Sequence, residues 1–242
     1  MTTIIISDIH NKVRWIEPAL EKLKEKYAYD EVVFLGDYFD NFGDSTFEAG
    51  GTANWLKCSI QNSNRIHLLG NHDMPYMIPH NDSLWCPGFN QYKCRVINET
   101  LKDMWHLFRP AYFTQNYLLS HAGFHPMLVT HPVKGVPSPD ELVVMANKGL
   151  EHLKTGLPHP LFNPGSRMGE PYIGGITWAD WNDEFICLDN VNQIVGHTPH
   201  NKVRMKNNDT CLSYCMDTHT QHIGIIIDGV VNFELRTQLL GF

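Results

Sequence analysis

Five short apolar segments of the sequence each end at side chains that can bind a metal ion. Each segment has the pattern of a buried strand, and a carboxylate, an amide or an imidazole follows its last apolar residue. Carboxylate oxygens and imidazole nitrogens together suit divalent ions such as manganese, iron and zinc. The predicted metal ligands are Asp8, His10, Asp37, Asn71, His121 and His197.

Six ligands are more than a single catalytic ion can use while it keeps positions open for substrate. They suit two ions roughly 3.5–4 Å apart that share one bridging carboxylate. Asp37 is the expected bridge, because it lies between Asp8 and Asn71 in the sequence. One zinc ion alone can lower the pKa of its water to about 7. The ligand set therefore predicts a hydrolase in which a hydroxide activated by two metal ions attacks the phosphorus of a phosphate ester.

Two further residues are predicted to be catalytic. His72 follows the ligand Asn71, so its side chain points another way, and we expect it to donate a proton to the leaving oxygen. Asp40 is expected to hold the other ring nitrogen of His72 and to favour the imidazolium form. Asn71 and His72 are also the predicted substrate-binding residues, since a neutral amide ligand leaves the site able to admit an anionic phosphate.

Strands and helices alternate in the first third of the chain. The order β-α-β-α-β predicts a parallel sheet whose carboxyl ends collect the polar clusters. In extended backbone, side chains two residues apart project to the same side, so Asp8 and His10 could bind one ion. The expected elements are strands at 3–7, 31–35 and 65–69, an amphipathic helix at 15–27, a loop at 41–52 and a helix from there to about 60.

The rest of the chain is predicted to be mainly antiparallel β-structure. Asn98 is expected to cap a short helix that ends near Phe108, and Ser138-Pro139 to begin another. Segments 74–96 and 155–175 are expected to be loops that cap the site. Further strands are expected at 112–114, 117–119, 194–195, 212–216, 223–227 and 230–235, with tight turns at Gln115-Asn116 and Asp228-Gly229. We predict one domain, 1–242, of class α/β (α+β): a four-layer αββα sandwich of two mixed sheets flanked by helices.

Composition narrows the functional classes. The chain has 242 residues and a formal charge of −7, which argues against binding to a nucleic-acid backbone. No apolar stretch reaches the roughly 18 residues of a membrane span, and the first residues lack the features of a signal peptide. Six cysteines scattered through a chain of this length predict reduced thiols and a cytoplasmic location, with a structural zinc site at Cys211 and Cys215 as a poorly spaced alternative.

The five polar blocks resemble the signature blocks of the calcineurin-like metallophosphoesterases. The Ser-His-Ala-Gly and Gly-His-Thr-Pro blocks are most similar to those of the phosphoprotein phosphatase branch, which includes the phage-lambda-type phosphatases. The resemblance implies the αββα sandwich, two ions (manganese first, iron or zinc as alternatives) and the ligand roles given above. The five blocks are Asp8-Ile9-His10, Gly36-Asp37-Tyr38-Phe39-Asp40, Gly70-Asn71-His72-Asp73, Ser120-His121-Ala122-Gly123 and Gly196-His197-Thr198-Pro199. In addition, Asp217-Thr218 resembles a later Asp-Thr element of that branch.

The chain departs from that branch at its phosphate-binding arginines. Asn41 stands where the branch has an arginine, and no arginine lies between Trp178 and Gly196. Arginine suits planar, bidentate phosphate binding, so Arg167 or Arg204 could take over the role. His200 is an alternative seventh ligand.

The preferred function is therefore a phosphomonoesterase similar to protein phosphatases, acting on a phosphoprotein or a nucleotide. The alternatives are a phosphodiesterase, a hydrolase of nucleotides or dinucleoside polyphosphates, and a non-catalytic binding scaffold with the same fold. Four aromatic residues are interpreted as packing residues, although they could stack on a base, and the other histidines as ordinary polar residues. The aromatic residues are Trp85, Tyr92, Trp178 and Trp181, and the histidines include His125, His159 and His219.

Overall fold

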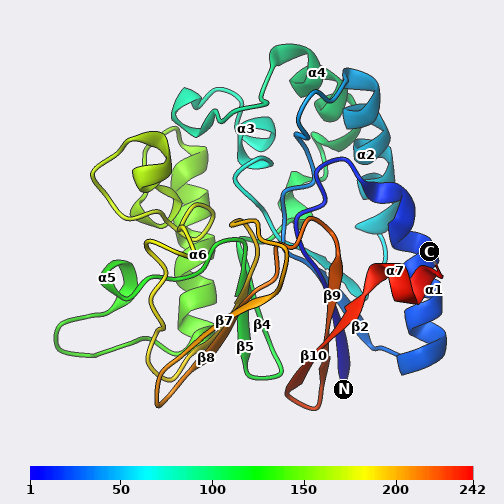
Figure 1. The fold of residues 1–242 in the computed structure, drawn as a ribbon. Helices are drawn as coiled ribbons and strands as arrows, with labels where there is room; N and C mark the ends of the chain where they lie inside the picture. Colours follow the sequence, from blue (N-terminus) through cyan, green and yellow to red (C-terminus); the bar gives the residue numbers. More distant parts are fainter. Residues whose placement is uncertain (242) are drawn as a thin grey trace.

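Two five-stranded β-sheets pack face to face between layers of helices in the computed structural model, which describes residues 1–241 (Figure 1). Helices α1 (Ile16–Tyr27) and α2 (Thr46–Ser59) lie outside the first sheet, and α6 (Pro139–Lys154) lies outside the second. This arrangement confirms the predicted fold class, an α/β fold with two mixed sheets flanked by helices. Among residues 1–241, no helix has the length and apolarity needed to cross a bilayer.

The first sheet has the strand order β10-β9-β1-β2-β3. Strands β1, β2 and β3 are parallel, as predicted, while β9 pairs antiparallel with both β1 and β10. The carboxyl ends of the three parallel strands therefore lie at one edge of the sheet. The strands span Thr2–Ile6 (β1), Glu31–Phe34 (β2), Arg65–His67 (β3), His222–Ile227 (β9) and Val230–Leu235 (β10).

The second sheet has the order β4-β5-β6-β8-β7 and is not mainly antiparallel. Strands β5, β6 and β8 pair in parallel, and only the outer pairs β4–β5 and β7–β8 are antiparallel. Antiparallel pairs still predominate among the strands of the second half, as expected, since β9 also pairs antiparallel with β1 and β10, but the parallel pairs at the centre of this sheet were not predicted. The strands span Ala111–Thr114 (β4), Tyr117–Ser120 (β5), Asn192–Val195 (β6), Arg204–Asn207 (β7, not predicted) and Leu212–Cys215 (β8).

Alternation along β1 shows how the layers form. Ile4 and Ile6 belong to the cluster that contains the apolar face of α1, whereas Ile5 belongs to the cluster between the two sheets. Successive side chains of a strand point to opposite faces, so an all-apolar strand can pack on both sides. The cluster between the sheets contains Ile5, Val33, Leu35, Ile66, Leu68, Tyr117, Leu119, Ile194, Met216 and Ile226.

Two helix boundaries differ from the prediction. Helix α2 begins at Thr46 rather than after residue 52, since Ser45 and Glu48 form a capping box at its start. Phe47 is consequently on the exposed side, at 83% exposure. Helix α4 spans Gln91–Leu101 and is capped by Asn90, so Asn98 lies inside this helix instead of starting one.

Other local predictions are confirmed. Ser138 caps α6 through a capping box with Glu141. The two tight turns have left-handed backbone at both of their central residues, as a type I′ hairpin requires. The remaining helices are α3 (Met74–Met77), α5 (Pro126–Val129) and α7 (Arg236–Leu240).

Candidate metal centre

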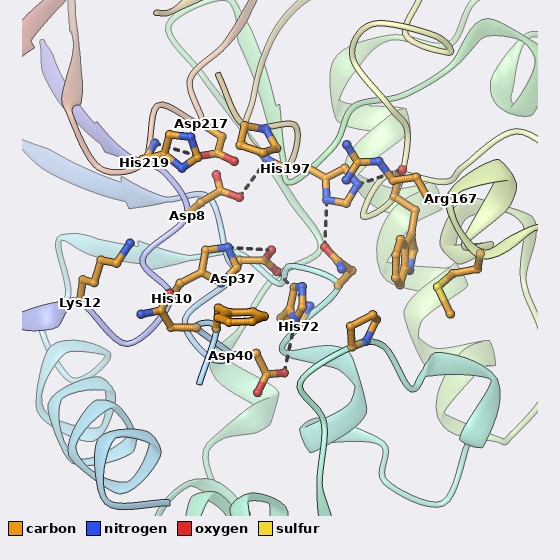
Figure 2. Close-up of a pocket in the computed structure, with 17 residues that line it drawn as sticks. Asp8, His10, Lys12, Asp37, Asp40, His72, Arg167, His197, Asp217 and His219 are labelled. Atoms are coloured by element: carbon orange, nitrogen blue, oxygen red, sulfur yellow. Dashed lines mark hydrogen bonds and ion pairs between the residues drawn. The ribbon is translucent and has the colours of Figure 1, made fainter. Parts of the chain in front are cut away.

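The loops that follow β1, β2, β3, β5 and β6 meet at the seam between the two sheets. They line a cavity of about 570 Å³, which Figure 2 shows with Asp37 near its middle. All six residues predicted as metal ligands are brought together here, and five of them are less than one-tenth exposed. The sixth, His10, is partly exposed at the edge of the cavity.

Asp37 belongs to two groups of ligand atoms. It lies with Asp8 and His10 in one group and with His121 and His197 in the other, each group having its atoms within 4.8 Å of one another. The first group joins the ends of the neighbouring strands β1 and β2. The second group crosses between the sheets, because His121 and His197 follow β5 and β6 of the second sheet.

Three imidazoles are oriented by backbone carbonyls so that their other nitrogen faces the carboxylates. His10 Nδ1 lies 3.0 Å from Phe39 O, His121 Nδ1 lies 2.9 Å from Leu35 O, and His197 Nε2 lies 3.0 Å from Trp178 O. Such contacts fix the tautomer and ring orientation of metal-binding histidines. The donor set therefore fits divalent cations, because imidazole nitrogens and carboxylate oxygens converge on a common centre.

Distances across the cluster are short. His121 Nε2 lies 3.3 Å from Asp37 Oδ2, and His10 Nε2 lies 3.7 Å from the same oxygen. The amide oxygen of Asn71 lies 3.0 Å from His121 Nε2 and 2.9 Å from His197 Nδ1. Asn71 thus supplies a neutral oxygen within the second group.

Backbone conformation, rather than strand alternation, aims several of these side chains. His10, Asp37 and His197 have φ values of 44°, 52° and 68°, which non-glycine residues rarely adopt. The argument that Asp8 and His10 share one side of extended backbone was therefore wrong for His10, which lies in a turn. That turn is held by the N–H groups of Ile9 and His10, both 2.9 Å from Asp37 O.

Position 70 requires glycine because the backbone and side chain of Asp37 pass very close to it. A Cβ atom at this position would lie 2.1 Å from Asp37 Oδ1 and 2.4 Å from the backbone nitrogen of Asp37. Asp73, fully buried, accepts hydrogen bonds from the backbone nitrogens of Asp37 (2.8 Å), Tyr38 (2.9 Å) and Gly70 (2.8 Å). The loops after β2 and β3 are thus locked together beneath Asp37.

Burial and mutual charge shape the electrostatics of the carboxylates. Burial, together with the charge of Asp37, raises the pKa of Asp8 despite the opposing effect of His121. Burial would also raise the pKa of Asp37, but His121 and His72 hold it well below its usual range. Burial and then Asp8 raise the pKa of Asp217 to about 7. Bound cations would therefore stabilise the charged forms of the three carboxylates that share this cavity.

His72 and Asp40 form a contact beside the cluster. His72 Nδ1 lies 3.2 Å from Asp40 Oδ2, and Asp37 and Asp40 raise the pKa of His72 well above its usual value although burial opposes this. The other oxygen of Asp40 accepts hydrogen bonds from the Tyr76 hydroxyl (2.6 Å) and from Lys93 Nζ (2.8 Å). Asp40 is thereby held in place by groups that the sequence analysis did not identify.

Several other lining residues were missed or left open. Asp217 and the exposed His219 line the cavity, and Lys12 adds a positive charge there. Their signal was the Asp217-Thr218 block, which predicts no position by itself. His200 is exposed and contacts the backbone of Lys202, outside the cavity lining.

The two candidate arginines differ. Arg167 lines the cavity, as Figure 2 shows, and its guanidinium binds Asp180 through Nε (2.9 Å) and NH2 (2.6 Å). Arg204 instead donates to the carbonyl of Thr198 and to Asn182 Oδ1, and it is not among the lining residues. Arg167 is therefore the arginine that the fold brings to the site.

Comparison with known proteins gives a family match over most of the chain. Residues 1–220 match the family model described as calcineurin-like phosphoesterase. No curated protein matches the sequence significantly.

Solved structures with a similar fold are distant in sequence. A hypothetical protein from Pyrococcus horikoshii OT3 is 12% identical, with a TM-score of 0.52, and the match covers 97% of this chain and 87% of that one. A protein serine/threonine phosphatase from Saccharomyces cerevisiae is 10% identical (TM-score 0.47; 97% and 79% covered). The phosphoesterase Yfce from E. coli is 11% identical (TM-score 0.43; 99% and 95% covered).

Proposed function

Because the chain belongs to the calcineurin-like phosphoesterase family, whose members are metal-dependent hydrolases of phosphate esters, we propose that it is a dinuclear phosphomonoesterase similar to protein phosphatases. The observation that carries this proposal is the shared carboxylate: Asp37 belongs to both groups of convergent ligand atoms. In the proposal one ion is held by Asp8, His10 and Asp37, and the other by Asp37, Asn71, His121 and His197. Manganese is the proposed metal, with iron or zinc as alternatives.

The bound ions would supply Lewis acidity, which polarises the phosphoryl oxygens and lowers the pKa of the attacking water. The residues of the chain orient the substrate and move the proton. In the proposal His72 donates a proton from Nε2 to the leaving oxygen, because Asp40 holds Nδ1 and favours the charged ring. Asn71 and His72 contact the phosphate.

Arg167 is the proposed phosphate-binding arginine. Its side chain lines the same cavity as Asp37 and His72, and its contacts with Asp180 and Thr198 hold the guanidinium at the cavity wall. A planar guanidinium can bind two phosphate oxygens. The loop of residues 155–175 would thus supply what the chain lacks at Asn41, and with segment 74–96 it would cap the site of a single domain.

The preference for a phosphomonoester rests on the two histidine-containing blocks that resemble the phosphoprotein phosphatase branch. A phosphodiesterase, or a hydrolase of nucleotides or dinucleoside polyphosphates, is the alternative within the same chemistry. A non-catalytic scaffold would be expected to lack at least one ligand, whereas all six are present and convergent.

The test uses the metal-loaded protein with p-nitrophenyl phosphate and bis-p-nitrophenyl phosphate. We expect turnover of the monoester with Mn²⁺, abolished by chelator, at a higher rate than that of the diester. A higher rate with the diester would contradict the phosphomonoesterase proposal and support the phosphodiesterase instead. Mass spectrometric metal analysis should give two equivalents per chain, and fewer than two with no turnover of either ester would support the scaffold.

A further inference from the structure

A second cavity, of about 680 Å³, adjoins the metal centre. It lies between segment 82–85 and segment 158–172, and Met168 lines both cavities. The preceding residue, Arg167, lines the metal-centre cavity. Because the Cα atoms of consecutive residues are about 3.8 Å apart, the proposed phosphate-binding arginine stands next to the wall of the second cavity.

The interior of this second cavity is apolar and carries exposed aromatic rings. Leu84, Leu153 and Phe162 line it and are at most 3% exposed, so they form a packed surface. Trp85 and Tyr172 also line it but are 40% and 62% exposed. The size falls within the range of roughly 300–1,000 Å³ that is usual for small-molecule sites.

The indole of Trp85 is held in position by a neighbouring ring. Its centroid lies 4.7 Å from that of Phe89, with 31° between the planes. Holding a ring in advance lowers the entropy lost when a ligand stacks on it. Trp85 therefore offers a pre-positioned aromatic surface.

The charged groups of the second cavity differ from those of the metal centre. Its lining includes the carboxylates of Asp82 and Glu170 but no lysine or arginine. Burial, and then the neighbouring His152, lower the pKa of His159, which favours its neutral form. The two carboxylates repel a second phosphate group. They favour instead a neutral ring that carries N–H donors.

We propose that the second cavity binds the base of a nucleotide whose phosphate lies at the metal centre, with the base stacked on Trp85 and Tyr172. This inference rests on the proposed phosphoesterase function for the position of the phosphate. An amino-bearing base such as adenine fits best, because its exocyclic N–H groups can donate to the carboxylates at the edge. The substrate class is accordingly a nucleotide rather than a phosphoprotein.

The test compares affinities by isothermal titration calorimetry. Adenosine 5′-monophosphate and glycerol phosphate are titrated into the Mn²⁺-loaded His72→Ala protein, in which hydrolysis should be slow during the titration, and adenosine into the chelator-treated protein. Stacking on an aromatic side chain changes affinity by roughly 5- to 150-fold per base. We expect the nucleotide to bind at least tenfold more tightly than glycerol phosphate, and adenosine to bind without metal.

Variants identify the cavity. Trp85→Ala should reduce the preference for the nucleotide by about tenfold, Tyr172→Ala should reduce it too, and Trp85→Phe should keep most of it. The matched control is Phe47→Ala, which removes another exposed aromatic ring that lines none of the cavities described here. Equal affinities for the two phosphates, or a preference that both alanine variants retain, would overturn the inference.

Hydrolysis of p-nitrophenyl phosphate is measured on the corresponding proteins that retain His72. Turnover of p-nitrophenyl phosphate without a preference for the nucleotide would refute the base site but not the proposed hydrolysis. A nucleotide preference that depends on Trp85, together with adenosine binding and no turnover of any phosphoester, refutes the proposed hydrolysis but supports the base site.

Discussion

Replacing the buried lysine Lys93 with methionine should destabilise the protein strongly. Its side chain is 3% exposed, and Nζ donates to Asp40 (2.8 Å), Asp44 (2.6 Å) and the carbonyl of Gly88 (2.9 Å). Burial disfavours the charged lysine, yet the hydrogen bonds with the two aspartates raise its pKa. Lys93→Met would leave two carboxylates, 2% and 4% exposed, without their shared cation.

The expected loss is about 3–5 kcal/mol in the free energy of unfolding, the usual cost of removing one partner from a buried ion pair. Since domains are commonly stable by only about 5–15 kcal/mol, the variant should fold but unfold at clearly lower urea concentration. Urea denaturation followed by circular dichroism measures this difference. The rate with p-nitrophenyl phosphate should also fall, because Asp40 would no longer be held against His72.

The matched control is Lys154→Met. Lys154 also binds a carboxylate, that of Glu151 at 2.7 Å, but the two side chains are 34% and 70% exposed. An exposed pair contributes about 0–1 kcal/mol. If the two lysine variants lost stability equally, the reasoning from burial would be refuted. Adding Asp44→Asn to Lys93→Met should recover part of the loss, since one of the two buried carboxylate charges that Lys93 neutralised is then removed.

The remaining predictions concern the reaction, the metal, the pH dependence and one glycine. His72→Ala should lower kcat by roughly 10²–10⁴-fold while metal analysis still gives two equivalents; an unchanged rate would exclude His72 as the proton donor. Chelator should lower the melting temperature, and Mn²⁺ should raise it with increasing concentration; a melting temperature independent of metal would contradict the proposed centre. Burial, and then the charge of Arg65, lower the pKa of His67 to about 3, whereas the unfolded chain takes up this proton near pH 6.5. Because the unfolded state binds the proton first, stability should fall as pH drops from about 6.5 toward 3, by about 2 kcal/mol at pH 5. Between pH 7 and pH 5 the free energy of unfolding, measured by urea denaturation, should fall by about 2 kcal/mol less in His67→Phe than in the unaltered protein. Equal decreases in the two proteins would refute the assignment. Gly70→Ala should abolish turnover, since its Cβ would collide with Asp37; full activity would show that the loop can move.

The candidate site was largely predictable because its signals are local. An apolar strand and the polar residue that follows it are adjacent in sequence, so Asp8, Asp37 and Asn71 could be assigned to one sheet edge without a structure. Contacts between distant segments left no such signal. Lys93 looks like any helical lysine until α4 is seen to pack beside Asp40, 53 residues earlier in the chain.

The features of the fold that were not predicted have the same origin. The parallel pairing of β5 with β6 joins residues more than 70 positions apart, and nothing in either strand distinguishes it from an antiparallel pair. The start of α2 was placed too late because Gly50 and Gly51 suggested a loop, whereas the capping box at Ser45 begins the helix before them. Arg167 could be named but not placed, because its position depends on contacts with Asp180 and Thr198.

The seam between the sheets has a consequence for how the enzyme can fail. Asp8, Asp37 and Asn71 follow strands of one sheet, while His121 and His197 follow strands of the other. Neither sheet supplies the whole ligand set, so any change that separates the two sheets should abolish activity even if each sheet stays folded. Enzymatic activity would then report whether the two sheets are still packed together.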